Sequence, residues 1–127
     1  MASSYETGKA LSERMNPGME AVLEERYGDL VPGLAQSVVD FAYGQQYARP
    51  GLGMRERVIA TIAAVAALGA QTGPQLRIHI KAGLSEGLTA QEIGEIIWQM
   101  ALYGGFPAAI SALNVLRDVL AEQETAD

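Results

Sequence analysis

The sequence predicts an all-α fold, and three observations carry this prediction. Apolar side chains recur at helical spacing along most of the chain, glycine and proline separate the periodic segments, and no stretch alternates as a half-buried strand would. With 127 residues, 49% of them hydrophobic, the chain has the usual size of one domain and can bury a core. We therefore expect about six helices in a single domain.

The N-terminal third is predicted to be helical with clear breaks. Residues 5–27 have helical spacing but contain Asn-Pro-Gly at residues 16–18, which predicts a kink or two separate helices. A further helix follows residues 30–33 and carries an apolar stripe to its expected end near Gly44. Residues 47–53 contain a proline and two glycines, so we expect a structured loop there.

The remaining segments are more apolar. A helix over about residues 54–69 starts with charged residues and then becomes apolar on all sides, which places it at the centre or at a subunit interface. Its apolar run is shorter than the roughly 20 residues that cross a bilayer. The next helix is expected to begin at Gly73-Pro74, another at the capping box Thr89-Ala-Gln-Glu92, and the last at Pro107.

Charge and composition narrow the expected partners. Fifteen acidic and nine basic residues give a net charge of −6, which disfavours nucleic acid and anionic membranes. The apolar stretches 58–70 and 108–116 are more than a small domain covers by itself, so we expect a homo-oligomer. The N-terminus lacks the apolar segment of a signal peptide and the chain has no cysteine, which together predict a cytoplasmic protein.

His79 is the main candidate for chemistry. The motifs of phosphate-binding loops, serine hydrolases, zinc proteases and calcium loops are absent, and one histidine without cysteine makes a transition-metal site unexpected. We therefore expect no metal and no cofactor. Imidazole titrates near neutral pH, and Gln75 lies one helical turn earlier, where it can orient the ring or donate to a substrate oxygen. The alternative is that His79, which lies on an apolar stripe, is a structural core or interface residue.

Arginine and aromatic residues supply further candidates. Arg49, Arg55 and Arg57 cluster around the loop before the apolar helix, where one of them can hold a substrate carboxylate or simply cap the loop and pair with a neighbour. Trp98 and Tyr103 are interpreted either as core or interface aromatics or as contacts to a bound molecule.

The second half of the chain resembles the carboxymuconolactone decarboxylase family over about residues 47–119. The residues that carry the resemblance are Arg49-Pro50-Gly51-Leu52, Arg57, Ile62-Ala63, Leu76-x-x-His79, Gly87-Leu88-Thr89, Glu92-Ile93 and Gln99-x-Ala101-x-Tyr103-x-Gly105-x-Pro107-Ala108. The resemblance implies an alkylhydroperoxidase D-like fold of helical hairpins, one domain over residues 1–127 with its core at about 30–120. It also implies a ring-shaped assembly, a trimer or hexamer.

The resemblance also separates two chemistries. In the alkylhydroperoxidase D type, a Cys-x-x-Cys pair precedes the histidine, and those two positions fall on Thr72 and Gln75. Because neither is cysteine, thiol peroxidase and disulfide reductase activity are not expected. The decarboxylase branch resembles this chain in needing no thiol, but it has Glu-x-x-x-His where this chain has Gln75 and His79.

The resemblance implies a cofactor-free carboxy-lyase that decarboxylates a carboxylated lactone or related oxo-acid from aromatic catabolism, an anionic small molecule. His79 is assigned as proton donor, Gln75 as its orienter or an oxygen donor, and Arg57 as carboxylate clamp. The substrate-binding residues assigned beside them are Arg49, Trp98 and Tyr103. Two alternatives stay open: a non-catalytic or small-acid-binding family member, and an isomerase that uses the same groups.

Overall fold

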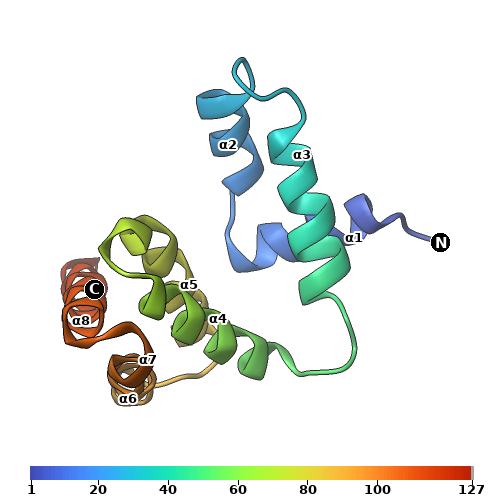
Figure 1. Ribbon diagram of the computed structural model, residues 1–127. Coiled ribbons are helices and arrows are strands. Elements are labelled where there is room, and N and C mark those ends of the chain that lie inside the picture. Colours follow the sequence, from blue (N-terminus) through green and yellow to red (C-terminus); the bar gives the residue numbers. More distant parts are fainter. Residues whose placement is uncertain (127) are drawn as a thin grey trace. The chain divides into compact units, whose positions relative to one another are not determined.

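The computed structural model describes residues 1–126, which contain helices and turns and no strand (Figure 1). The all-α prediction is confirmed. Contacts divide the chain into two compact units, Met1–Leu52 and Gly53–Asp127. No helix among residues 1–126 is both long and apolar enough to cross a membrane.

The first unit consists of four helical segments. In chain order these are α1 (Ser4–Met15), α2 (Met19–Tyr27), α3 (Leu34–Val38) and the π-helix η1 (Val39–Tyr47). The Asn-Pro-Gly break separates α1 from α2, so the two-helix option for residues 5–27 is the correct one. Gly18 and Gly33 precede α2 and α3 with φ of 79° and 87°, a left-handed conformation that glycine adopts without strain.

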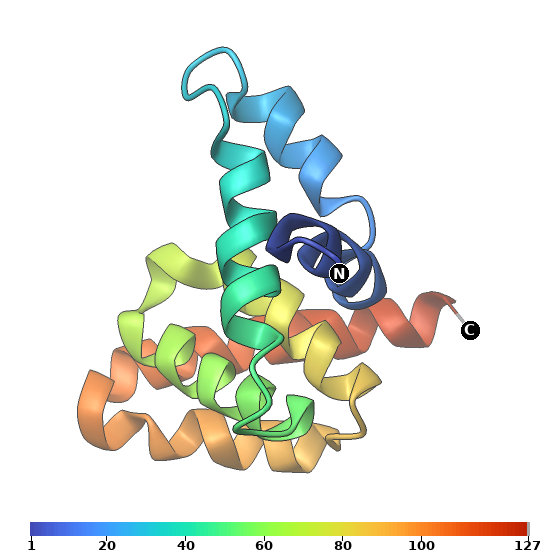
Figure 2. The ribbon, with the colours of Figure 1, turned by 90° about the vertical axis from the view of Figure 1, so that its right-hand side faces the viewer.

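The expected helix end at Gly44 is wrong, because α3 continues without interruption through η1 to Tyr47. Gly44 serves a different purpose. A Cβ atom at Gly44 would collide with the backbone carbonyl of Ser4, and a Cβ atom at Gly8 would collide with that of Val39. The two glycines therefore let α1 cross η1 at backbone contact distance, and α1 packs mainly against η1 (Figure 2).

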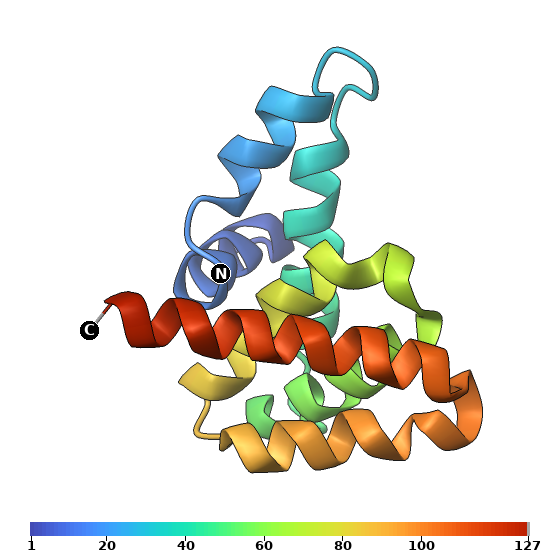
Figure 3. The same ribbon diagram turned by 90° about the vertical axis from the view of Figure 1, so that its left-hand side faces the viewer.

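The second unit is built from helical hairpins. Its elements are α4 (Met54–Leu68), the 3₁₀ turn η2 (Ala70–Thr72), α5 (Gly73–Ser85), α6 (Ala90–Gln99), α7 (Ala101–Gly104) and α8 (Phe106–Ala126). Helix α4 packs against α5, and α8 runs along the unit in contact with α5, α6 and α7 (Figure 3). The predicted starts at Gly73-Pro74 and at the Thr89–Glu92 box are confirmed, whereas the last helix begins one residue before Pro107.

The core of the second unit is apolar and tightly closed. Five of its largest side chains have 0% exposure, and they come from α4, α5 and α6: Val58, Ile62, Ile80, Ile93 and Ile97. Helix α4 contacts every other helix of this unit, as expected for a central helix. Its apolar character extends beyond the core, however, since Ala60, Ala64 and Leu68 are exposed in the single chain.

Candidate active site around His79

Helix α5 positions His79 at the edge of the apolar core. Leu76 and Ile80 are 2% and 0% exposed and fix the orientation of the helix within the unit. His79 lies beside them on the helix surface and is half-buried, while Gln75, one turn earlier, is exposed. The predicted apolar stripe therefore exists, but His79 lies on its margin and retains access to solvent.

The imidazole of His79 has no protein partner among residues 1–126: no hydrogen bond or ion pair involves it. Burial lowers the pKa of His79 below the usual 6.5, since a half-buried ring is harder to charge than a solvated one. The ring is therefore mainly neutral at neutral pH, with one nitrogen able to donate and the other able to accept. The ring nitrogens are not among the enclosed atoms, so water or a ligand can reach them.

Gln75 does not orient the imidazole by direct contact. No hydrogen bond joins Gln75 to His79 or to another residue within 1–126. Its exposed amide, one turn from the ring on the same helix face, is instead available to a ligand oxygen. The role of Gln75 as a donor to a substrate oxygen stays a prediction.

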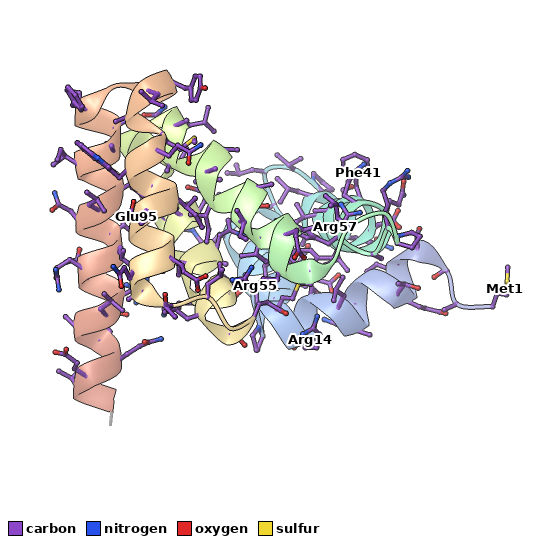
Figure 4. The ribbon with its side chains drawn as sticks, turned by 90° about the horizontal axis from the view of Figure 1, so that it is seen from below. Met1, Arg14, Phe41, Arg55, Arg57 and Glu95 are labelled. Carbon is purple, nitrogen blue, oxygen red and sulfur yellow. The ribbon has the colours of Figure 1, made fainter. Side chains whose placement is uncertain are left out.

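The three arginines near the loop lie in different environments. Arg55 donates to a carboxylate oxygen of Glu92 at 2.9 Å and so ties the start of α4 to the start of α6. Arg57, also on the first turn of α4, is half-buried and its Nε atom is enclosed (Figure 4). Arg49 is exposed and follows η1 in the first unit. Arg55 and Arg57 both lie on α4, the helix that packs against the helix of His79, and Arg57 is the more buried of the two.

The comparisons with known proteins decide the family. The sequence model of the carboxymuconolactone decarboxylase family matches residues 32–118. This chain belongs to the carboxymuconolactone decarboxylase family. It is 34% identical to the 4-carboxymuconolactone decarboxylase of Acinetobacter baylyi over 95 residues, which are 75% of this chain and 69% of that protein.

Two further relatives show the range of the carboxymuconolactone decarboxylase family. An uncharacterized 15.0 kDa protein of Paracoccus denitrificans is 33% identical over 119 residues, 94% of this chain and 89% of its own length. A nitrosuccinic acid decarboxylase of Metarhizium robertsii is 28% identical over 83 residues, 65% of this chain and 57% of its own length. Decarboxylases therefore stand among the similar proteins, together with a member whose activity is unknown.

Thr72, one of the two positions at which the resemblance places a thiol, has a defined hydrogen-bonding environment. Its hydroxyl donates to the carbonyl oxygens of Val65 and Gly69, both at 2.8 Å, and so closes the end of α4. The position therefore has a structural task here, because it holds the turn that connects α4 to the helix of His79. The family resemblance identified Thr72 only as a position without a thiol and did not reveal this role.

Trp98 and Tyr103 lie on α6 and α7. Trp98 is 48% exposed and stacks on Phe106, with ring centroids 5.6 Å apart and 17° between the planes. Tyr103 is 79% exposed. The structure groups Trp98 with Leu102 and Phe106 around a hollow of about 280 Å³, and His79 is not part of its lining. The assignment of Trp98 and Tyr103 as substrate-binding residues stays a prediction.

Sequence reasoning missed a hollow of about 420 Å³ between the starts of α4 and α6. Ile59, Leu88 and Ile96 form its apolar part, and Arg55 and Glu95 are among its charged residues (Figure 4). No sequence pattern indicated this hollow, because Arg55 and Glu92 are 37 positions apart and come together only when α4 packs against α6. No group of three or more potential metal ligands occurs within residues 1–126.

Proposed function

We propose that the protein is a carboxy-lyase that removes CO₂ from a small dicarboxylic acid, with His79 supplying the proton that forms the new C–H bond. The observation that carries this proposal is the half-buried imidazole of His79, which has no hydrogen-bond partner within residues 1–126. Membership in the carboxymuconolactone decarboxylase family supports the reaction type.

The substrates in the names of two relatives share a chemical skeleton. In 4-carboxymuconolactone and in nitrosuccinic acid, the carbon that bears the departing carboxylate also bears a CH₂–COO⁻ group and an electron-withdrawing system. Both molecules are therefore 2-substituted succinates. We extend this class to the present chain, with a carboxylated lactone as the first candidate and the identity of the electron-withdrawing group left to experiment.

The reaction requires few protein groups. As the C–CO₂ bond breaks, its electron pair moves into the conjugated lactone carbonyl, or into a nitro group, and CO₂ leaves. A proton from His79 then forms the new C–H bond, and solvent returns a proton to the ring. Donors aimed at the oxygen that gains charge contribute on the order of 3–4 kcal/mol each. Gln75 is the donor proposed here, and a positioned acid adds about 10²–10⁴-fold.

Arg57 is proposed to hold the carboxylate that the product retains. A guanidinium group pairs with a carboxylate through two parallel N–H···O bonds, and partial burial strengthens such a pair because less water competes for it. Arg57 is half-buried on α4, the helix packed against α5, which supports this role. The assignment of Arg49 from the sequence stays a prediction.

A CO₂-release assay tests the proposal. Purified protein is incubated with 4-carboxymuconolactone, 2-nitrosuccinate and, as a matched control, 2-methylsuccinate, which has the same two carboxylates but cannot accept the electron pair. The proposal expects CO₂ from at least one of the first two and none from the control. No CO₂ from any activated 2-substituted succinate would contradict it.

A binding role without catalysis is the second candidate, and Gln75 favours it. An amide cannot exchange protons as the glutamate of the resembling decarboxylases can. In this case the protein binds succinate-type acids in calorimetry but releases no CO₂. A Gln75→Glu variant that gains CO₂ release would then identify Gln75 as the reason for the missing activity.

A further inference from the structure

The hollow of about 420 Å³ between the starts of α4 and α6 has a lining that includes none of the residues proposed for decarboxylation. We call it the α4–α6 hollow. It is shaped by side chains of α4, of the loop before α6 and of α6 itself: Arg55, Ile59, Leu88, Glu92, Glu95 and Ile96. Its volume lies within the about 300–1,000 Å³ that is usual for small-molecule sites, which are mostly apolar and contain a few polar groups.

The deeper part of the α4–α6 hollow is aliphatic. Leu88 is 3% exposed, and Ile59 and Ile96 are half-buried, whereas the charged side chains of the lining are exposed. The hydrocarbon part of a ligand would therefore contact the three aliphatic side chains and lose water there, while a charged group of the same ligand would lie at the rim.

The rim contains one carboxylate that is already used and one that is not. An oxygen of Glu92 accepts from Arg55 at 2.9 Å, and its other oxygen accepts the backbone N–H of Thr89, also at 2.9 Å. Glu95 lies one turn later on α6 and makes no hydrogen bond or ion pair within residues 1–126 (Figure 4). With one arginine and two glutamates, the lining carries a net charge of −1.

These charges favour a cationic ligand over an anionic one. A ligand carboxylate would have to take Arg55 from Glu92 and would lie near the charge of Glu95. A ligand ammonium group pairs with Glu95 and breaks no bond that the protein makes. Glu95 is on the second turn of α6, beyond the first turn where the positive helix end opposes a cation. The net charge of −6 on the chain also attracts cations.

We propose that the α4–α6 hollow binds a small aliphatic amine, with the ammonium group on the Glu95 carboxylate and the hydrocarbon chain against Ile59, Leu88 and Ile96. An exposed ion pair contributes little affinity, so the charge selects the ligand and the chain supplies most of the binding. Each methylene that enters the hollow strengthens binding by up to about 4-fold. This proposal does not depend on the proposed decarboxylase activity.

A titration with matched probes tests the proposal. The full ¹⁵N-labelled chain is titrated at pH 7, where primary amines are charged, with n-butylamine, n-hexylamine, hexan-1-ol and hexanoate. We expect saturable amide shifts concentrated in residues 88–96. Hexylamine should bind about 10-fold more tightly than butylamine and about 3–5-fold more tightly than hexanol, and hexanoate should be the weakest ligand. No saturable shift with hexylamine, shifts confined to other residues, or hexanol or hexanoate binding as tightly as hexylamine would overturn the proposal.

A lysine side chain of a protein partner offers the same ammonium group on a four-carbon stem, so Nα-acetyl-lysine methylamide is compared with n-butylamine. The proposal expects butylamine to bind at least as tightly, because its chain enters the hollow without a peptide backbone at its end. Tighter binding of the lysine derivative would assign the hollow to a protein partner and remove the free amine as the occupant.

Matched charge removals test the contact with Glu95. Glu95→Gln in the hollow and Glu25→Gln on α2 each remove one negative charge from an exposed side chain. Glu95→Gln should weaken hexylamine binding by about 3–5-fold and bring it to the affinity of hexanol, while Glu25→Gln should leave both unchanged. Far-ultraviolet circular dichroism verifies that both variants are folded. Equal effects of the two variants, or a Glu95→Gln variant that keeps the preference for hexylamine over hexanol, would contradict the proposal.

Discussion

The two units of the molecule are held together in different ways. The first unit buries few large apolar side chains and relies on a backbone crossing at Gly8 and Gly44 and on polar contacts. Among these, Tyr5 donates to Glu20 and Lys9 pairs with Glu20 at 2.8 Å. The second unit closes around fully buried aliphatic side chains. The comparison teaches that the unit with the candidate proton donor is also the one with the denser apolar core, which suits a site that needs fixed geometry.

The largest expected effect on stability lies in the second unit. Ile93 is 0% exposed and packs near Gly83, so Ile93→Ala leaves a cavity. We expect it to lower the free energy of unfolding by about 2–5 kcal/mol, measured by urea denaturation. Val22→Ala, at a 55% exposed position of the first unit, is the control and should change it by no more than about 0.5 kcal/mol. Equal effects of the two variants would show that the apolar core is not the main source of the stability of the second unit.

A smaller effect is expected at the crossing in the first unit. Gly44→Ala forces a methyl group into the backbone of Ser4, and we expect a loss of about 1–3 kcal/mol from overpacking. Gly51→Ala is the matched control, because nothing lies within 4 Å of a Cβ atom there. Thermal unfolding of both variants checks the expectation. If Gly44→Ala has the same melting temperature as the wild type, the close crossing of α1 and η1 does not determine the stability of the first unit.

The helix caps provide the smallest and most closely matched test, since both units contain a capping box. Ser3 and Glu6 cap α1, and Thr89 and Glu92 cap α6. Thr89→Ala should cost about 1 kcal/mol, and Ser3→Ala less, because α6 buries Ile93 and Ile97 in the core whereas α1 buries only Gly8 and Ser12, so that fraying of α1 loses less apolar contact. The hydrogen bond from the Thr89 backbone N–H lowers the pKa of Glu92, followed by the attraction of Arg55.

The sign of the Glu92 contribution follows from this lowered pKa. The folded state holds the charged carboxylate more strongly than the unfolded state does. Its stabilising contribution is therefore complete above the unfolded pKa of about 4.5 and disappears as the pH falls through the folded value. The difference in melting temperature between wild type and Glu92→Gln should shrink toward pH 3. A difference that is constant with pH would contradict the charge-based account.

Sequence patterns predicted local features well and spatial features less well. The box at Thr89–Glu92 and the helix start at Gly73-Pro74 are local signals, and both were confirmed. Gly44 was wrongly predicted to end its helix. A glycine occurs both at helix ends and where two backbones pass close together, and only the position of α1 shows that Gly44 belongs to the second case. The spacing of apolar residues also did not predict the π-helix, in which the number of residues per turn differs from that of an α-helix.

The candidate site was predictable only in part, because it too combines local features with contacts between distant residues. The spacing placed His79 on the apolar stripe of its helix. Its partial exposure at the edge of that stripe depends on how α5 packs against α4 and α8, which the spacing does not indicate. Trp98 and Tyr103 are residue types that are common at interfaces, but the sequence did not show that both side chains are exposed, which only the folded chain reveals. The Arg55–Glu92 pair joins residues distant in sequence, which no single pattern indicates.

The proton-donor role of His79 is tested most directly by the pH dependence of kcat/KM for wild type and His79→Gln, measured on an activated 2-substituted succinate. Because burial lowers the pKa of His79 and the charged ring is the donor, wild-type kcat/KM should fall as the pH rises through a value below 6.5. The pH at which kcat falls should be higher than the pH at which kcat/KM falls, since the bound anionic substrate favours the charged ring. His79→Gln should stay folded, lose about 100-fold or more in kcat/KM and lose this limb. A folded His79→Gln variant with wild-type kcat/KM and an unchanged pH profile would contradict the central claim.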